Sequence, residues 1–581
     1  MNVQAPARGA TRFRIDFDRV FIAVVALLFL TLALATIRDY GVMWDCSEMY
    51  LGDRNLQFLL TFDADYLDYG KPMPMPEYSR PDHPDFQAIA HAAVINLPLY
   101  SPQDIFPVGY VSSSLTKKIF YSWLGWLGAI EAHHLAPILW FTLLLIAFHR
   151  FVLGTLGRWP AVIAVLALAT YPRLLAHSHF NLKDIPSLTL FSLVVFAFYR
   201  GVTAESWRSI LAASVLWGVA IATRPNSLFL PLVLAPWLAW VLWSRHRAGR
   251  RLLTRELRAA LVAFPFVSLV ATLACWPFLL ADFPRHLLAT IDFLVSFGYG
   301  GDGHWHAAPA INGLVTMPVV VLALAAVGLV AACLRPARLG GEGLLLLLVG
   351  WLVVPPLRVS IPSAVDYDVI RHWLEFVPPV CVFAGLGGAR ILAGLGALGR
   401  RLFPAAAAKA RGGLATGVAL CLVGLSFSPV IAWEIRNHPN QLVFYNALVG
   451  GLQGAQRRQL RGATDYWGIS TRSGMRWLGE HAEPNAALVV PIGHSTVAYT
   501  EKVWLRKDIR FINSEILDVD EVWRQIAAYQ GVLYVMYVTR TEFYSDELRA
   551  LDAQVPPAWS IQVDGGTILK ILRFDKQPGP L

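Results

Sequence analysis

Residues 21–37 read FIAVVALLFLTLALATI, a run of seventeen positions without a charged side chain. Backbone amides find no water inside a bilayer, so an apolar stretch of this length is expected to cross the membrane as a helix. Comparable apolar runs start near Leu135, Ala161, Ile185, Ile210, Leu228, Leu261, Ile311, Leu344, Phe376 and Ala415. The sequence therefore predicts a polytopic α-helical membrane protein with about eleven transmembrane helices.

The composition agrees with a membrane location. Of the 581 residues, 56% are hydrophobic and only 15% are charged, whereas soluble domains carry about 25% charged residues. The formal net charge is +9, but the basic residues gather in short connections between apolar runs, with six arginines in residues 245–258 alone. Cytoplasmic loops are enriched in Lys and Arg in this way. The charge therefore reflects membrane topology and does not indicate a nucleic-acid partner.

The placement of the basic residues predicts the orientation of the chain. Arg8, Arg12, Arg14 and Arg19 precede the first apolar run, which puts the N-terminus in the cytoplasm. That run is longer than the apolar region of a cleaved signal peptide, so we expect a retained signal anchor. With eleven helices, the basic residues follow the positive-inside rule, by which Lys and Arg gather in cytoplasmic loops. Arg224 is the one misfit, and Arg173 and Arg371 also fall at the outer face.

Three regions follow from this topology. We expect a cytoplasmic N-terminus at residues 1–19, a transmembrane domain at residues 20–433, and an extracytoplasmic C-terminal domain at residues 434–581. The transmembrane domain would include a large first extracytoplasmic loop at residues 38–133. The tail changes in character, because short apolar runs at residues 487–491 and 532–538 indicate strands and residues 519–529 have helical spacing. The tail is therefore predicted to be a small α/β domain.

The first candidate for chemistry is Asp45, which closely follows the first helix in Gly-Val-Met-Trp-Asp at residues 41–45. A tryptophan here suits the interfacial belt and would hold Asp45 at the membrane surface. Such a carboxylate could deprotonate an acceptor hydroxyl while that hydroxyl attacks the anomeric carbon of a lipid-borne sugar. The alternative is an ordinary charge at a helix end.

A second polar group lies between the third and fourth expected spans, where residues 177–186 read HSHFNLKDIP. His177 and His179 are too few to indicate a metal site, and the five cysteines add no metal-ligand or pairing pattern. Lys183 and Asp184 could face a substrate. Asp184 could instead cap the next helix ahead of Pro186.

Cationic side chains at the outer helix ends could bind a lipid phosphate. Arg224 is followed by Pro225, and Arg371 is followed by His372. Arginine offers paired hydrogen bonds to phosphate oxygens, which suits a phosphate leaving group. The alternative is binding to a lipid headgroup, or a salt bridge from Arg371 to Asp366 or Asp368.

Several short motifs occur along the chain in a characteristic order. They are Gly-Val-Met-Trp-Asp at 41–45, His83-Pro84, Asn-Leu-Lys-Asp-Ile-Pro at 181–186, Arg-His-Trp-Leu-Glu-Phe-Val-Pro-Pro at 371–379, His438-Pro439, Phe444-Tyr445-Asn446, Gly450-Gly451 and Asp465-Tyr466-Trp467-Gly468. In this order they resemble the bacterial, ArnT- and PMT-like branch of the membrane glycosyltransferases related to dolichyl-phosphate-mannose–protein mannosyltransferases, in the GT-C superfamily. The resemblance runs from about residue 20 to about residue 480.

The resemblance implies roles for particular residues. Asp45 would be the catalytic base, Asp184 would bind or orient a substrate, and Arg371 would contact the donor phosphate. The family often has Asp-Glu after its first helix, whereas Cys46 follows Asp45 here, so either Glu48 replaces the second carboxylate or that role is absent. The candidate substrate-binding residues are Glu48, His83, His179, Lys183, Asp184, Arg224, Arg371 and His372.

The predicted function is an inverting glycosyltransferase at the extracytoplasmic face of a bacterial inner membrane. Its donor would be a polyprenyl-phosphate-linked sugar, its acceptor a glycolipid, polysaccharide or protein, and it would need no cofactor or obligatory metal. One alternative is a transporter or flippase of lipid-linked intermediates. Transporters tend to have polar residues at mid-membrane and paired broken helices, whereas here the polar residues gather in outer loops and no helix pair is matched. The other alternative is an envelope assembly scaffold whose tail binds partners.

Overall fold

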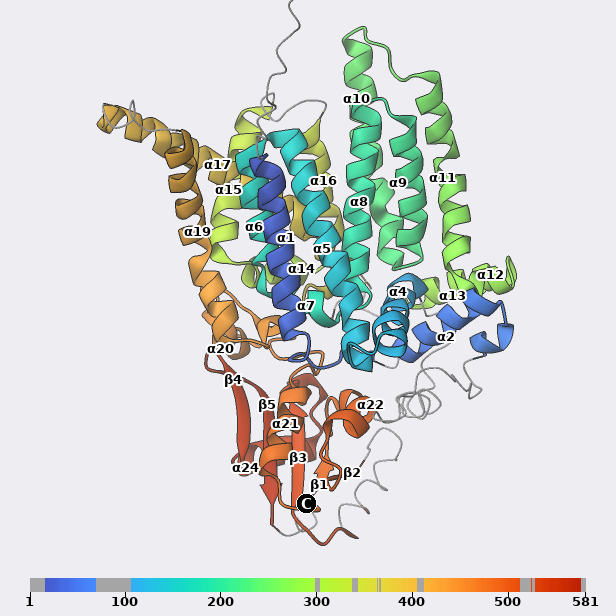
Figure 1. Ribbon diagram of the computed structural model, residues 1–581, viewed down its shortest axis with the longest axis vertical. Helices are drawn as coiled ribbons and strands as arrows, with labels where there is room; N and C mark the ends of the chain where they lie inside the picture. The colour runs from blue at the N-terminus through green and yellow to red at the C-terminus, as the bar shows by residue number, and fades with distance from the viewer. Residues whose placement is uncertain are drawn as a thin grey trace, which may run out of the picture.

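The computed structural model describes residues 16–46, 48–68, 106–297, 303–336, 343–362, 364, 367–404, 412–512, 524 and 528–575. A bundle of long helices occupies one part of the molecule, and a small domain containing a β-sheet lies at one end of the bundle (Figure 1). Among the described residues, seven helices are long and apolar enough to cross a membrane, or up to nine when two bent helix pairs each count as one span. The chain is a multi-pass integral membrane protein.

The bundle consists of long apolar helices. These are α1 (Phe17–Thr36), α5 (Ala129–Leu156), α6 (Arg158–Ala169), α8 (Asp184–Thr203), α9 (Trp207–Ile221), α10 (Leu230–Arg247), α11 (Arg255–Cys275), α15 (Val319–Leu334), α16 (Leu344–Ser360), α17 (Val377–Leu402) and α19 (Gly412–Arg436). Shorter helices lie near the end that faces the sheet: α2 (Glu48–Thr61), α4 (Pro107–Lys117), α12 (Pro277–Ala281) and α13 (Arg285–Phe297) (Figure 1). Two shorter apolar helices, α9 and α16, could also be spans. Added to the seven long helices and the two bent pairs of the described residues, they give the eleven spans expected from the sequence.

Two spans are broken at prolines. Helix α6 is followed by α7 (Pro172–Phe180) with a bend of 64°, and α14 (Ala308–Thr316) is followed by α15 with a bend of 113°. Pro172 begins α7 and Pro318 precedes α15, and proline suits the start of a helix because it lacks the N–H group that would bond to the preceding turn. These two breaks were not predicted from the sequence. The bend at α7 turns its residues toward the end of the bundle that carries the sheet.

Glycines allow close approach of α15 and α17. A Cβ at Gly387 would collide with the carbonyl oxygen of Leu324, and a Cβ at Gly328 would collide with that of Phe383. Small residues at helix contacts are a common means of packing in membranes, where no hydrophobic effect drives helices together. The same device joins α9 to α11, because Gly218 faces the carbonyl oxygen of Ser268.

The C-terminal domain has a five-stranded mixed sheet in the order β2-β1-β3-β5-β4. Its strands are β1 (Ala487–Val489), β2 (Arg510–Ile512), β3 (Leu533–Val538), β4 (Trp559–Val563) and β5 (Gly566–Phe574). Strand β1 runs parallel to both β2 and β3, whereas β5 runs antiparallel to β3 and to β4. Helices α20 (Gly451–Arg457), α21 (Thr471–His481), α22 (His494–Trp504) and α24 (Asp546–Gln554) accompany the sheet.

The predicted small α/β domain is therefore present. Strands β1 and β3 lie within the runs that the sequence marked as strands, and their residues are buried. Short, fully apolar runs of this kind are typical of central strands covered on both faces. Most of the helix predicted at residues 519–529 lies outside the described residues.

Hydrogen bonds join this domain to the bundle. The Asn446 amide donates to the carbonyl oxygens of Leu314 (2.7 Å) and Met317 (2.8 Å), at the break between α14 and α15. Arg472 of α21 donates to the carbonyl oxygen of Tyr40 at 3.0 Å, just after α1. The sheet domain is thus held against the chain segments that connect the bundle helices at this end.

The packing predicts an opposite effect of alanine at two glycines of α17. Gly387→Ala should destabilise the protein by about 1–3 kcal/mol, because the added methyl group must push α15 away. Gly394→Ala on the same helix should be neutral or slightly stabilising, because nothing lies within 4 Å of its added Cβ. Thermal unfolding in detergent measures both, and equal midpoints for the two variants would contradict the packing argument.

Candidate active site

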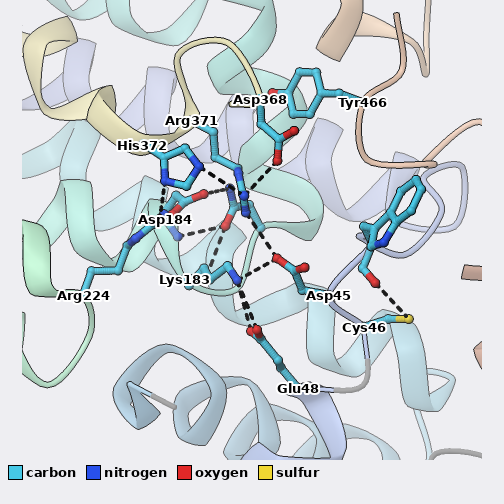
Figure 2. A network of polar contacts seen from close by, with 12 residues as sticks. Asp45, Cys46, Glu48, Lys183, Asp184, Arg224, Asp368, Arg371, His372 and Tyr466 are labelled. Atoms are coloured by element: carbon cyan, nitrogen blue, oxygen red, sulfur yellow. Dashed lines mark hydrogen bonds and ion pairs between the residues drawn. The ribbon is translucent and has the colours of Figure 1, made fainter. Parts of the chain in front are cut away.

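The candidate site lies where the bundle meets the C-terminal domain. Asp45 sits in the turn after α1, Glu48 begins α2, Lys183 immediately precedes α8, and Arg371 begins a short 3₁₀ helix, η6 (Arg371–Phe376), ahead of α17. Figure 2 shows these side chains converging from separate segments of the chain. The four residues were candidates from the sequence, and the fold places them in one network.

Asp45 is shared by two cations. Its Oδ2 accepts a hydrogen bond from Lys183 Nζ at 2.7 Å and from Arg371 Nη1 at 3.2 Å (Figure 2). The side chain of Asp45 is 21% exposed, whereas that of Arg371 is only 3% exposed. Asp45 is thus the member of this ion pair that a molecule entering from outside could reach.

Lys183 also binds the second carboxylate. Its ammonium donates to both carboxylate oxygens of Glu48 at 3.2 Å. Burial disfavours the charge on Lys183, but Asp45 and Glu48 outweigh it and raise the pKa of the ammonium. Lys183 therefore remains charged and holds the two acids together.

The two carboxyl groups differ in their affinity for a proton. Burial would raise the pKa of Asp45, but the charges of Lys183 and Arg371 outweigh burial and lower it to about 2. For Glu48, burial prevails over the attraction of Lys183, and the neighbouring charge of Asp45 adds to the effect, so its pKa is raised to about 7. Asp45 is ionised in this state, and Glu48 can exchange a proton near neutral pH.

Arg371 is held from two further sides. Its Nη2 lies 2.8 Å from Asp368 Oδ2, and its guanidinium lies over the ring of Trp467, 4.4 Å from the ring centroid. Trp467 belongs to a tight turn in which Asp465 accepts hydrogen bonds from the backbone N–H groups of Trp467 (3.3 Å) and Ser470 (2.6 Å). The Asp-Tyr-Trp-Gly motif therefore supplies a platform for the arginine.

Asp184 and Arg224 form an ion pair beside this network. The Asn181 amide also donates to Asp184 Oδ2 at 2.7 Å, and Asn181 Oδ1 accepts from the backbone N–H groups of Lys183 (3.2 Å) and Asp184 (2.8 Å). Asn181 therefore provides the capping interaction that the sequence offered as the alternative role of Asp184. Asp184 is left with its carboxylate directed at Arg224.

His372 joins the two cationic groups. Its Nδ1 lies 3.0 Å from Arg224 Nη2, and its Nε2 lies 3.3 Å from Arg371 Nη2. Arg358 of α16 donates to the backbone carbonyl oxygen of His372 and lies 3.9 Å from Glu375. Arg224, Arg358 and Arg371 are therefore gathered around one histidine. Arg358 was not among the candidates from the sequence, because it lies inside an apolar helix.

His179 does not belong to this network. Its ring stacks on Tyr40 with centroids 4.3 Å apart, and its Nε2 lies 3.2 Å from Thr36 Oγ1 at the end of α1. His179, a candidate substrate-binding residue from the sequence, therefore packs α7 against α1 and the segment that follows α1. His83 lies outside the described residues.

Cys46, which follows Asp45, faces the C-terminal domain. Its thiol donates to the carbonyl oxygens of Trp44 (3.8 Å) and Ser495 (3.6 Å). This position thus contributes to the domain contact, and the carboxylate that shares Lys183 with Asp45 is that of Glu48, two residues after Cys46. Within the described residues, no group of three or more His, Cys, Asp or Glu side chains could hold a metal ion.

Like Arg358, Arg540 and Asp368 belong to the network but were not functional candidates from the sequence. Arg540 follows β3 and donates to Asp368 Oδ1 at 2.9 Å. Asp368 was considered only as a salt-bridge partner of Arg371, which it is. No spacing or motif connects Arg540 with Arg371, because 168 residues separate them and only the docking of the sheet domain brings them together.

A family model matches part of the chain, and several solved structures are similar to it. Residues 119–276 match the family model described as Dolichyl-phosphate-mannose-protein mannosyltransferase. Among solved structures, the chain is similar to ArnT from Cupriavidus metallidurans in the apo state, with 15% identity over 95% of this chain and 97% of that chain and a TM-score of 0.46. It is also similar to the archaeal oligosaccharyltransferase AglB from Archaeoglobus fulgidus, with 12% identity over 97% of this chain and 75% of that chain and a TM-score of 0.46.

A third similar structure is the arabinofuranosyltransferase AftD from Mycobacteria, with 15% identity over 97% of this chain and 40% of that chain and a TM-score of 0.40. No curated protein sequence matches the chain. The family match includes Lys183, Asp184 and Arg224, while Asp45 and Arg371 lie outside the matched range. Residues 119–276 thus carry the domain of the dolichyl-phosphate-mannose–protein mannosyltransferase family, which confirms the resemblance inferred from the motifs over that range.

Proposed function

We propose that this chain transfers a sugar from a polyprenyl-phosphate carrier to an acceptor hydroxyl. The observation that carries the proposal is the sharing of one oxygen of Asp45 by Lys183 and Arg371 at the end of the helix bundle. A transferase of this kind needs a base for the acceptor and cations for the lipid phosphate, side by side at the membrane surface. The family match of residues 119–276 supports this class of reaction.

In this reaction the acceptor oxygen attacks the anomeric carbon from the face opposite the phosphate. The bond between that carbon and the phosphate oxygen breaks, and polyprenyl phosphate leaves with the electron pair. The acceptor proton passes to the Asp45 carboxylate. Arg371 and Lys183 stabilise the charge on the leaving phosphate, since charge-assisted hydrogen bonds to phosphate are strong.

Because Asp45 is paired with Lys183 and Arg371, its strength as a base would depend on whether the sugar donor is bound. With both cations bound to it, Asp45 has a pKa of about 2 and is a weak base. A donor phosphate that takes over Arg371 and Lys183 would remove the charges that lower this pKa. Donor binding would then convert Asp45 from a paired counter-ion into a base, and the proton would be accepted only when a donor is present.

The orientation of the chain is part of the proposal. The basic loop between α10 and α11 lies at the end of the bundle opposite the sheet domain (Figure 1). Cytoplasmic loops are basic, so the N-terminus and this loop would face the cytoplasm of a bacterial inner membrane. The site, with the domain at residues 434–581, would then face outward, where a glycolipid, polysaccharide or protein could serve as acceptor.

The two bent helix pairs favour transport of lipid-linked intermediates as a second candidate function, because broken helices are common in transporters. The charged network argues for the first function, since it lies at the bundle end beside the sheet domain. Proteoliposomes that move a lipid-linked sugar across the bilayer without glycosylating an acceptor would favour the second.

Asp45→Asn should reduce sugar transfer by about 100-fold or more, because an amide cannot accept the acceptor proton. The measurement is mass spectrometry of lipids and envelope glycans from a strain that lacks the chain and is complemented with wild type or the variant. Asp292→Asn is the matched control, since Asp292 is exposed on α13 near the same end of the bundle. Full restoration of a missing sugar by folded Asp45→Asn would exclude Asp45 as the base.

Binding of the donor lipid should depend on Arg371. Undecaprenyl phosphate should bind the detergent-solubilised wild type, and Arg371→Gln should weaken that binding by about tenfold or more through loss of a charge-assisted contact. Arg476→Gln, at an exposed arginine of α21, is the control and should bind as wild type does. Equal affinities of wild type and Arg371→Gln would remove Arg371 from the donor site.

The rate of transfer should rise with pH through about 7. Below this pH Glu48 is protonated and neutral, so the Lys183 ammonium pairs with the Asp45 carboxylate alone. Above this pH, ionised Glu48 competes with Asp45 for Lys183. This competition weakens the ion pair between Lys183 and Asp45, so that Asp45 is a stronger base. Glu48→Gln should remove this rise in kcat/KM, measured from about pH 5.5 to about pH 8.5. A rise near pH 7 that persists in Glu48→Gln would assign it to another group.

Folding stability should fall as pH rises, whereas the transfer rate should rise. The folded pKa of Glu48 is raised, so the stability that its protonated form contributes is complete below the unfolded value of about 4.3 and is lost as pH rises through about 7. The thermal midpoint of wild type should therefore fall relative to that of Glu48→Gln between these pH values. A constant difference between the two proteins would contradict the shift.

A further inference from the structure

Arg540 connects the sheet domain to the site. It lies just after β3, its side chain is 10% exposed, and its guanidinium uses three nitrogens. Nη2 donates to Asp368 Oδ1 at 2.9 Å, Nη1 donates to the carbonyl oxygen of Tyr466 at 2.8 Å, and Nε donates to Glu542 Oε1 at 3.1 Å. Phe543 supports the guanidinium from one face, with its ring centroid 4.4 Å away. Arg540 is therefore held in a single position.

Both groups that Arg540 binds in the site are groups that hold Arg371. Asp368 gives one carboxylate oxygen to Arg540 and the other to Arg371, at 2.9 and 2.8 Å. Tyr466, whose carbonyl Arg540 binds, precedes Trp467, and the ring of Trp467 lies beneath the Arg371 guanidinium. Arg540 therefore contacts one support of Arg371, Asp368, directly and binds the backbone next to the other, Trp467.

The segment that carries Asp368 is strained. Asp368 and Val369 adopt left-handed φ values of 59° and 61°. A β-branched residue such as Val rarely adopts this conformation, and it persists only where the surroundings impose it. Gly462 lies against Val369, because a Cβ there would come within 2.6 Å of its side chain. Contacts from the tail therefore maintain this turn.

The charges explain why the support must come from an arginine. Asp368 is 4% exposed, and burial raises its pKa although Arg371 and Arg540 both oppose this. An ionised carboxylate that is buried is costly unless it is paired with cations and its oxygens accept hydrogen bonds, and Arg371 and Arg540 supply both to Asp368. With Arg371 as its only partner, Asp368 would draw that guanidinium away from Asp45, or would become protonated and release it.

We propose that Arg540 is a positioning residue of the donor site, which through Asp368 and the Tyr466 backbone holds the Arg371 guanidinium where it meets the donor phosphate. This inference rests on the proposed function of the site. It also gives the sheet domain a defined task, since the domain completes the cation site of the bundle. Removal of Arg540 would leave the catalytic groups present but would release the donor-binding arginine.

The test compares binding of undecaprenyl phosphate by the purified full chain and its variants. Arg540→Gln should weaken binding by about tenfold, and in an Asp368→Asn background its further effect should be smaller, because the contact through Asp368 is already altered and only the contact with the Tyr466 carbonyl remains to be lost. Arg510→Gln, at an exposed arginine of β2 in the same domain, is the control. In transfer assays, Arg540→Gln should raise KM for the donor more than KM for the acceptor.

The outcomes separate this inference from the proposed function. Loss of binding in Arg371→Gln but wild-type binding in folded Arg540→Gln would overturn the positioning role and leave the proposed function standing. Additive losses in the Arg540→Gln, Asp368→Asn double variant would also overturn it. If undecaprenyl phosphate binds neither wild type nor any variant, the proposed function fails first. Should Arg540→Gln not fold, Asp368→Asn must show the same raised donor KM.

Discussion

The sharing of Asp45 Oδ2 by Lys183 and Arg371 is the interaction on which the rest of the site depends. Buried charges are costly unless each one has a partner of opposite sign, and here acids and cations alternate along one network. Glu48 and Asp368 extend it on either side. Because each group neutralises its neighbours, the loss of one member changes the charge state and position of the others.

This arrangement has a consequence for ligand binding. A network whose charges are already paired binds an anion only by exchange, in which a phosphate takes the place of a carboxylate. Asp45 is the exposed carboxylate of the central pair, and the cation beside it, Arg371, is buried. Entry of a phosphate would therefore displace Asp45 first. The same exchange that binds a donor would free the carboxylate that the proposed reaction requires.

The candidate residues could be identified from sequence to different degrees. Asp45, Lys183 and Arg371 each stand at the end of an apolar run, so helix boundaries alone place them at the membrane surface. The position of His179 could not be read from the sequence, because its neighbours in sequence are site residues while its ring stacks on Tyr40. Arg540 gave no signal, since its place in the network depends on a contact between two domains.

The sequence by itself determined that the chain crosses the membrane many times and ends in a small α/β domain. Hydrophobic runs and strand-like segments are local properties of the sequence. In the bilayer, a helix satisfies all backbone hydrogen bonds within the segment itself, so a long apolar run predicts a helix. Only the tertiary structure decided which charges meet. The pKa values of Asp45 and Glu48 differ because burial prevails at Glu48, whereas the charges of Lys183 and Arg371 prevail at Asp45. Electrostatic effects depend on the distance between charges and on their burial, and the order of residues along the chain gives neither quantity.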